Sequence, residues 1–332
     1  MLTSLVGSYP QPDWLIDREK LRGRLPPRVR ASELWRIDPA YLQDAQDAAA
    51  LVAIHDQERA GLDIVTDGEV RRESYSNYFV MALEGVDVDN PGSVLDRNGN
   101  PMPAPRVHAP IRRREPVLVR DVAFLRAHTD RLIKVTVPGP FTLAAQSDNQ
   151  FYEHPQELAF AFADAVRDEV HALFAAGADI VQLDEPWMES KADDARAYGI
   201  ETLHRALDGV AGTTALHICF GYPLFVPGHK RAYRFLPELA AAPVDQISIE
   251  TAQAELDVSV LSQLEGKTVV LGVIALDSDE VETPEVVAER IKRAQPYKRE
   301  LVAAPDCGMK YLSREAAFGK LQSLVAGAKL AA

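Results

Sequence analysis

Four residues of metal-binding types lie in the second half of the chain: His217, Cys219, Glu250 and Cys307. His217 and Cys219 are two residues apart in an apolar run, so on a β-strand their side chains would point to the same face. One imidazole, one carboxylate and two thiolates form a donor set suited to tetrahedral Zn²⁺. This ion also holds thiols deprotonated near neutral pH. We therefore predict a zinc site formed by these four residues.

These residues lie at the ends of short runs rich in valine, isoleucine and leucine. Eight such runs cover residues 3–9, 62–69, 132–139, 178–186, 214–221, 246–253, 269–277 and 301–308. Segments with helical periodicity separate most of them, at 41–60, 155–176, 195–207, 235–242, 284–294 and 315–328. Strand–helix alternation repeated eight times predicts an α/β fold, a (β/α)8 TIM barrel, with a doubly wound open sheet as the alternative.

One region, about residues 78–130, departs from this alternation. It contains the segment PGSVLDRNGNPMPAP with an Asn98-Gly99 turn. We expect a hairpin-bearing insertion there, between the second and third strands. No linker or low-complexity segment interrupts the rest of the chain, so we expect a single catalytic domain over residues 1–332.

Polar residues also follow other predicted strands, among them Ser8, Glu69 and Asp184. In an α/β barrel the C-terminal strand ends form the mouth of the active site. Closing the barrel would bring these side chains to the same end as the four metal-binding residues. Packing alone does not require carboxylates at those points, so we regard Glu69 and Asp184 as candidate catalytic residues.

Composition narrows the class of protein. The 332 residues include 36 Lys+Arg and 49 Asp+Glu, which gives a net charge of −13. Such an acidic chain is a poor candidate for binding nucleic acid or anionic membranes. The N-terminus lacks a signal-peptide pattern, and two cysteines do not make a disulfide framework. We expect a cytoplasmic protein that acts on small molecules and binds neither nucleic acid nor membrane.

Six segments carry a family resemblance: VGSYPQP, GLDIVTDGE, VQLDEP, HICFGY, ISIE and PDCGMK. In this order they are similar to the catalytic C-terminal barrel of cobalamin-independent methionine synthase, which shows GSFPQT, a GE pair, IDEP, HMCY, a strand-end glutamate and NPDCGLK. The resemblance runs from Leu5 to Lys310. It implies a zinc-dependent methyltransferase in which the thiol of homocysteine accepts a methyl group from a folate, giving methionine.

The resemblance also assigns individual residues. It matches His217, Cys219, Glu250 and Cys307 to the zinc ligands. It matches three further residues, Ser8, Glu69 and Asp184, to the groups that hold the amino-acid end of homocysteine. The two carboxylates would pair with the substrate ammonium. Salt bridges with Arg71 or Arg72 are the alternative for these carboxylates.

The part of the resemblance that concerns the methyl donor is incomplete. Gln146 stands where the family has a tryptophan that resembles a wall for the pterin, and Asp277 stands where it has an HSP histidine. The alkyl donor is therefore left open between a methylfolate, a methylcorrinoid and another electrophile, and a protein that delivers the donor is a further candidate partner.

Two alternative functions remain at this point. The first resembles epoxyalkane:coenzyme M transferases, which share the His-x-Cys…Cys zinc site, and there Arg71 and Arg72 would supply positive charge for a sulfonate. The second is a non-catalytic zinc-binding protein, in which four protein ligands would close the site.

Overall fold

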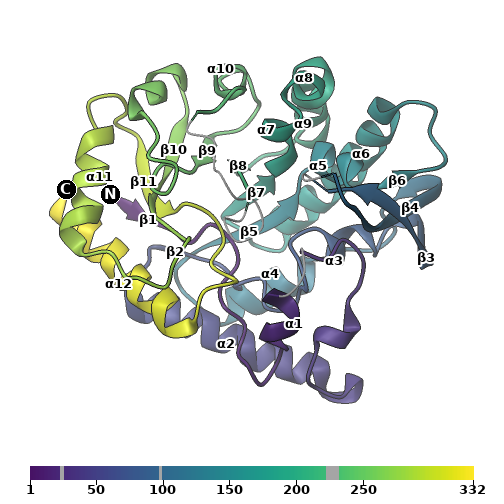
Figure 1. Cartoon of the computed structure of the whole chain (residues 1–332), viewed down its shortest axis with the longest axis horizontal. Helices are drawn as coiled ribbons and strands as arrows, with labels where there is room; N and C mark the ends of the chain where they lie inside the picture. Colours follow the sequence, from purple (N-terminus) through teal and green to yellow (C-terminus); the bar gives the residue numbers. More distant parts are fainter. Residues whose placement is uncertain (23–25, 97–98, 222–231) are drawn as a thin grey trace.

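The computed structural model describes residues 1–22, 26–96, 99–221 and 232–332, and a ring of eight parallel strands lies at its centre (Figure 1). These strands are β1 (Leu2–Thr3), β2 (Ile64–Val65), β5 (Leu132–Pro138), β7 (Ile180–Asp184), β8 (Thr213–Ile218), β9 (Gln246–Ile249), β10 (Thr268–Ile274) and β11 (Leu301–Pro305). They pair in the order β1-β11-β10-β9-β8-β7-β5-β2. A parallel bridge between Ser4 and Ile64 closes the ring. The predicted TIM barrel is confirmed, and the open-sheet alternative is wrong.

The strands end earlier than the apolar pattern predicts. The strand expected over residues 62–69 is formed only at Ile64–Val65, and Glu69 lies in the turn that follows. Cys219, Glu250 and Cys307 likewise lie one or two residues beyond β8, β9 and β11. Most of the residues expected to do chemistry therefore sit on loops that a rigid ring of strands positions, whereas His217 and Asp184 lie within β8 and β7.

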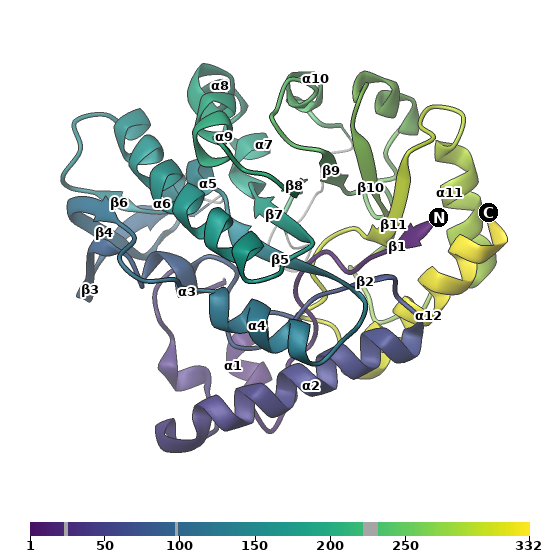
Figure 2. The same cartoon turned by 180° about the vertical axis from the view of Figure 1, so that it is seen from behind.

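Helices surround the ring on its outer side (Figures 1 and 2). Those of seven or more residues are α2 (Leu42–Ala60), α4 (Val119–Ala127), α6 (Pro155–Ala175), α9 (Ile200–Ala206), α11 (Pro284–Ala294) and α12 (Arg314–Leu330). Shorter α-helical turns are α1 (Arg18–Arg22), α3 (Asn77–Val80), α5 (Pro140–Ala145), α7 (Pro186–Ser190), α8 (Ala192–Asp194) and α10 (Leu236–Leu239). The 3-10 turns are η1 (Ser32–Leu34), η2 (Pro39–Tyr41) and η4 (Val258–Gln263), and η3 (Ala195–Gly199) is a π-helical turn.

Two apolar layers stabilise the barrel. The larger one packs the strands against the helices. The smaller one is a separate cluster of Val6, Ile64, Ile180, Ala215, Val270, Val302 and Ala304. Its members come from β2, β7, β8, β10, β11 and the segment after β1, which are spread around the ring, so the cluster lies inside it. The barrel is therefore a packed core and not an open channel.

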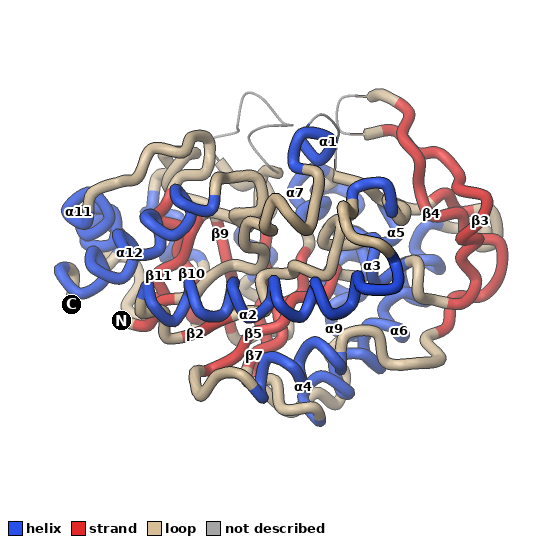
Figure 3. Tube along the Cα trace, turned by 90° about the horizontal axis from the view of Figure 1, so that it is seen from below, coloured by secondary structure: helices blue, strands red, loops and turns tan. Residues whose placement is uncertain are grey.

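The expected insertion is a long antiparallel hairpin of β3 (Glu84–Leu95) and β4 (Pro101–Arg112). The two-residue strand β6 (Asp148–Asn149) pairs with β4. Figure 3 shows this hairpin projecting at the end of the molecule away from the two termini. Asn98 of the expected turn lies outside the described residues. Helix α4, which the predicted insertion included, instead packs against β5 and α6 as part of the barrel.

Candidate metal and substrate site

Three of the four predicted metal ligands come together at the C-terminal mouth of the barrel. The ligand atoms of His217, Cys219 and Cys307 all lie within 4.8 Å of one another, and all three residues are buried. They come from β8, from the residue that follows it and from the loop after β11, and β9 and β10 separate these two strands in the sheet. The closed ring is therefore what brings these side chains into contact range.

The imidazole of His217 is oriented for a ligand. Its Nδ1 lies 2.9 Å from the hydroxyl of Ser248, which is its partner in register on β9. Its Nε2 is buried and has no hydrogen-bond partner among the described residues. A buried polar atom without a partner is costly, and a hydrogen bond at one ring nitrogen commonly fixes the other toward a metal. His217 therefore fits a metal ligand that binds through Nε2.

The two thiols need a cation before both can ionise. The pKa of Cys307 lies well above its usual value, first because of its hydrogen bond with Cys219 and then because of burial and the charges of Cys219 and Glu250. Burial lowers the pKa of His217, but the neighbouring Cys219 thiol and the charge of Asp184 raise it overall. A divalent cation would offset this concentration of negative charge. The donor set and its burial therefore fit Zn²⁺.

Glu250 lies beside this group without being part of it. Its Oε1 accepts a hydrogen bond from the Phe220 amide at 3.0 Å, and its Oε2 accepts one from Gln253 Nε2 at 2.8 Å. Burial and the neighbouring charge of Cys219 raise the pKa of the Glu250 carboxyl well above its usual range. The role of Glu250 as the fourth ligand remains a prediction.

Asp306, which precedes Cys307, ties the loop after β9 to the end of β11. Its carboxylate accepts hydrogen bonds from three consecutive amides, those of Thr251 at 3.1 Å, Ala252 at 3.0 Å and Gln253 at 2.7 Å. Sequence analysis gave Asp306 no role, although it lies in the apolar run 301–308. The structure shows that it fixes the segment that follows Glu250 relative to Cys307.

Asp184 ends β7 next to the metal group. It is the partner in register of His217, and Gln182 Nε2 donates to its Oδ1 at 2.8 Å. Burial raises the pKa of Asp184 to about 7, with His217 opposing this rise and the Glu69 carboxylate adding to it. The two predicted substrate carboxylates, Glu69 and Asp184, therefore lie close enough to influence each other's charge.

Glu69 has a backbone conformation that is unusual for its type. Its φ of 52° lies in the left-handed region, and its amide donates to Asp67 Oδ1 at 3.0 Å. The side chain is buried, and Oε1 accepts a hydrogen bond from Thr136 Oγ1 at 2.8 Å. Such strained conformations persist where the surroundings impose them, often at functional sites.

The two arginines near these carboxylates bind other groups. Within the described ranges, neither Glu69 nor Asp184 forms an ion pair with an arginine. Arg71 instead lies 2.8–3.6 Å from three other carboxylates, those of Asp47, Asp67 and Asp121. Arg72 donates through one nitrogen to the carbonyl and the hydroxyl of Thr136. The described residues therefore show no direct salt bridge to Glu69 or Asp184, although Arg72 is close enough that nearby carboxylates, Glu69 first, raise its pKa against the effect of burial.

Ser8 presents a hydroxyl that lacks a partner. It is 2 % exposed, and its Oγ is buried without a hydrogen bond to any described residue. Its carbonyl accepts the Met309 amide at 2.9 Å, so the loop after β1 is attached to the loop that carries Cys307. Its predicted role at the amino-acid end of a substrate is neither supported by a contact nor contradicted.

Sequence reasoning missed Lys134 on β5. Its partner in register, Ile180, belongs to the cluster inside the ring, so Lys134 also faces the interior. Its Nζ is buried and has no hydrogen-bond partner among the described residues. Burial lowers the pKa of Lys134 to about 7, although Asp184 and Glu69 oppose the shift. A lysine inside the apolar run LIKVTV was the available signal.

Gln146 and Asp277, the two positions that depart from the family pattern, lie in different environments, one buried and one exposed. Gln146 is buried at the end of α5, where it accepts a hydrogen bond from Ser76 Oγ at 2.9 Å and donates to the hydroxyl of Tyr75. It therefore offers no flat apolar face. Asp277 is exposed in the loop after β10.

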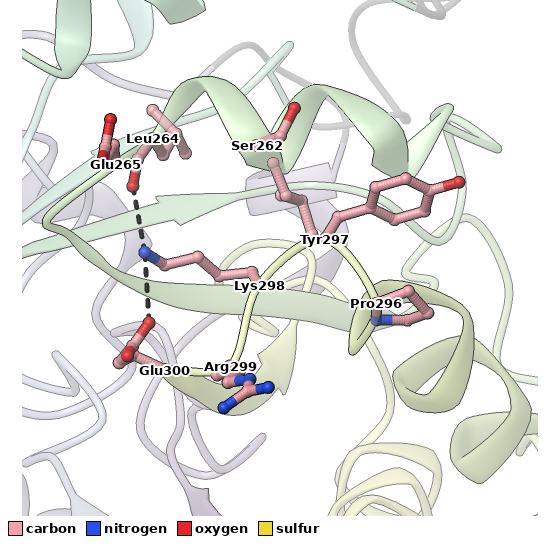
Figure 4. Close-up of a pocket in the computed structure, with 9 residues that line it drawn as sticks. Ser262, Leu264, Glu265, Pro296, Tyr297, Lys298, Arg299 and Glu300 are labelled. Carbon is pink, nitrogen blue, oxygen red and sulfur yellow. Dashed lines mark hydrogen bonds and ion pairs between the residues drawn. The ribbon is translucent and has the colours of Figure 1, made fainter.

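A hollow of about 320 Å³ lies apart from this site, between η4 and the segment that leads into β11 (Figure 4). On its wall, Lys298 Nζ donates to the Leu264 carbonyl at 3.1 Å and lies 3.3 Å from Glu300 Oε2. Glu300 directly precedes β11, whereas Cys307 follows the other end of that strand. The hollow therefore lies toward the opposite end of the barrel.

No helix in the described parts of the chain is long and apolar enough to cross a membrane.

Comparison with known proteins agrees with this geometry. Residues 1–330 match the family described as "Cobalamin-independent synthase, Catalytic domain". The methionine synthase of Sulfurisphaera tokodaii is 32 % identical over 99 % of this chain and 91 % of its own length. That of Saccharolobus solfataricus is 33 % identical over 99 % and 94 %.

Solved structures give the same result. A B12-independent methionine synthase from a Shewanella species superposes with a TM-score of 0.90 at 32 % identity, covering 99 % of this chain and 96 % of that one. A putative methionine synthase from Listeria monocytogenes, with a TM-score of 0.74 at 18 % identity, shares the fold. The chain thus belongs to the cobalamin-independent methionine synthase family and is a methyltransferase.

Proposed function

We propose that this chain transfers a methyl group to the thiol of homocysteine, with Zn²⁺ bound by His217, Cys219, Glu250 and Cys307. The observation that carries the proposal is the position of Asp184. It is the partner in register of His217, and it lies within electrostatic reach of Glu69. These positions support a thiol-activating group beside an ammonium-binding pair of carboxylates, the combination that an amino acid with a thiol side chain requires.

Bound Zn²⁺ would supply one element of the chemistry, which is to favour the deprotonated form of a coordinated substrate thiol near neutral pH. The chain's own residues set the charge around that sulfur. Two thiolates and one carboxylate outweigh a 2+ ion, so the site as a whole is negative. This charge keeps the substrate sulfur electron-rich, and its electron pair forms the new bond to the methyl carbon while the donor leaves with the old one.

The carboxylates would act at the other end of the substrate. Glu69 and Asp184 would accept charge-assisted hydrogen bonds from the ammonium, and the free hydroxyl of Ser8 would bind a further polar atom of the amino-acid group. Holding both ends of homocysteine places the sulfur in a fixed position for attack, which is a large part of catalysis. The Shewanella relative was solved in complex with selenomethionine, an analogue of the product proposed here.

The donor is proposed to be a methylcorrinoid rather than a free methylfolate, either as a small molecule or delivered by a partner protein. The family tryptophan is replaced by Gln146, whose amide is bonded to Ser76 and Tyr75. The family histidine is replaced by Asp277, which is exposed. These two differences remove groups suited to a pterin and to its leaving nitrogen.

Two other functions fit the site less well. A coenzyme M-type thiol would need a basic pocket for its sulfonate, and Arg71 is already surrounded by Asp47, Asp67 and Asp121. A zinc-storage protein would have no use for two buried carboxylates beside the metal group. We further propose that residues 1–332 act as one catalytic domain in the cytoplasm, where both cysteines stay reduced.

The proposal is tested by zinc content and by methyl transfer in the same preparations. The wild-type protein should contain one zinc per chain by elemental analysis and should methylate homocysteine from an activated methyl donor. Cys307→Ser should lose most of both. Ser262→Ala, at an exposed position of η4 beside the hollow toward the opposite end of the barrel, serves as the control. Stoichiometric zinc in Cys307→Ser would contradict the ligand assignment.

A further inference from the structure

We propose that Tyr233 is a positioning residue for the metal ligands, and this inference rests on the zinc site proposed above. Its hydroxyl donates to the Ile218 carbonyl at 3.0 Å and accepts a hydrogen bond from the Glu250 amide at 2.9 Å. Ile218 stands between His217 and Cys219 in the chain. One hydroxyl thus joins the backbone that carries two ligands to the backbone that carries a third.

The Tyr233 hydroxyl connects the two strand ends just beyond the last paired residues of β8 and β9. The last residues paired between β8 and β9 are Ile218 and Ile249. Cys219 and Glu250 are the first residues beyond this pair, and no ladder hydrogen bond fixes the distance between them. The Tyr233 hydroxyl bridges a carbonyl of one strand end and an amide of the other. It therefore extends the connection between the two strands by one step, to the level of the ligands.

The ring of Tyr233 is itself held in place. It stacks on Phe220, with ring centroids 4.4 Å apart and an interplanar angle of 30°. Phe220 follows Cys219 directly, and its amide donates to Glu250 Oε1 at 3.0 Å. The aromatic pair and the three hydrogen bonds form one connected unit. Asp306 provides the corresponding connection from the loop after Glu250 to Cys307.

This arrangement predicts a specific effect when only the hydroxyl is removed. Tyr233→Phe keeps the ring and its stacking on Phe220 but leaves the Ile218 carbonyl and the Glu250 amide without their partner. The two strand ends can then move relative to each other. Residues that orient metal ligands typically change metal affinity 10- to 100-fold when mutated, so we expect a loss of zinc affinity in that range.

The experiment compares wild type, Tyr233→Phe and Tyr152→Phe as full-length proteins. Tyr152 is a matched control, because its hydroxyl also accepts a hydrogen bond from a backbone amide, that of Ile111 at 2.9 Å. Ile111 belongs to β4 of the insertion and not to the barrel. Zinc affinity is measured by chelator competition. Ligand geometry is followed by the absorption bands of the Co²⁺-loaded proteins, and the melting temperature of each metal-free protein is recorded.

The expected result is a 10- to 100-fold weaker zinc affinity and altered Co²⁺ bands in Tyr233→Phe alone, with metal-free melting temperatures similar in the two variants. Zinc affinity within twofold of wild type would overturn the proposal. A much lower metal-free melting temperature in Tyr233→Phe than in Tyr152→Phe would also overturn it, because the role would then be structural. Failure of the wild-type protein to bind zinc would overturn the proposed function and this inference together. Unchanged zinc affinity in Tyr233→Phe, with zinc bound by wild type, would overturn this inference alone.

Discussion

The Glu69 carboxylate occupies the space that a side chain on Gly7 would need. A Cβ on Gly7 would stand 2.4 Å from Glu69 Oε1 and 2.9 Å from Thr136 Cγ2. Neither distance is tolerated between real atoms. The loop after β1 and the turn after β2 can approach this closely only because residue 7 has no side chain, and that approach holds Glu69 against Thr136.

Gly7→Ala should therefore weaken substrate binding without removing any group that contacts the substrate. The new methyl group displaces the Glu69 carboxylate, so we expect the KM for homocysteine to rise about tenfold, which corresponds to roughly 1.4 kcal/mol. Zinc content should stay at the wild-type level. Steady-state kinetics and elemental analysis check both points. Gly319→Ala is the control, because its Cβ would meet only the end of the Val281 side chain, at 3.1 Å. An unchanged KM in Gly7→Ala would show that the position of Glu69 does not matter.

Asp184→Asn should impair recognition of the substrate ammonium. A charge-assisted hydrogen bond contributes about 1.5–3 kcal/mol, so the KM for homocysteine should rise roughly 10- to 150-fold. An analogue that keeps the thiol but lacks the amine should be affected far less. The measurement is the ratio of kcat/KM for homocysteine to that for the amine-free thiol, in wild type and variant. An identical ratio in both proteins would refute the ammonium pocket and favour the coenzyme M-type alternative.

Lys134→Met should stabilise the fold. Burial lowers the pKa of Lys134 to about 7 from a usual 10.5, so the folded state binds this proton less tightly than the unfolded chain. The lysine therefore costs about 4 kcal/mol at pH 7, and this cost decreases as the pH rises toward 10.5. The free energy of unfolding of Lys134→Met should exceed that of wild type at pH 7. The difference should fall by about 2 kcal/mol at pH 9.

Lys320→Met is the matched control for this prediction. Lys320 is equally buried, but its Nζ is bound by Glu282 at 2.9 Å, by the Ala275 carbonyl at 3.0 Å and by the Glu280 carbonyl. Removing it leaves the Glu282 carboxylate without its cation, so this variant should be destabilised. Equal effects of the two substitutions in chemical denaturation at pH 7 would contradict the distinction drawn between a partnered and an unpartnered buried lysine.

The barrel and its metal group could be predicted because they depend on regular patterns. Eight apolar runs, most of them separated by helical segments, favour a closed ring over an open sheet, and a ring brings His217 and Cys307 to one mouth although 90 positions of the chain separate them. Tyr233 and Lys134 could not be assigned in this way. Tyr233 acts from a loop with no periodic pattern, through a hydroxyl whose partners are backbone groups. Lys134 lies in a strand whose neighbouring residues are mostly apolar, so the sequence does not show whether its side chain faces the barrel interior or the surrounding helices.

The donor prediction follows from what Gln146 and Asp277 lack. A flat aromatic contact contributes about 0.5–1.5 kcal/mol beyond burial, and Gln146 is instead bonded to Ser76 and Tyr75. Transfer from methyltetrahydrofolate requires protonation of the leaving nitrogen, whereas transfer from methylcobalamin does not. Asp277 puts a carboxyl group where the family has an imidazole, and the imidazole is the side chain most often used as a general acid near neutral pH. We therefore expect measurable methylation of homocysteine from methylcobalamin, and little or none from methyltetrahydrofolate.

The assay holds enzyme, zinc and homocysteine constant and changes only the donor, with methionine formation measured from each. Asp277→His restores the side chain type that the family has at this position. If the missing acid limits the reaction, a histidine at this position should raise the rate with methyltetrahydrofolate and leave the rate with methylcobalamin unchanged. Efficient turnover of the wild-type protein with methyltetrahydrofolate alone would show that another acid and another pterin-binding surface are present. In that case the substitutions at positions 146 and 277 would not determine the choice of donor.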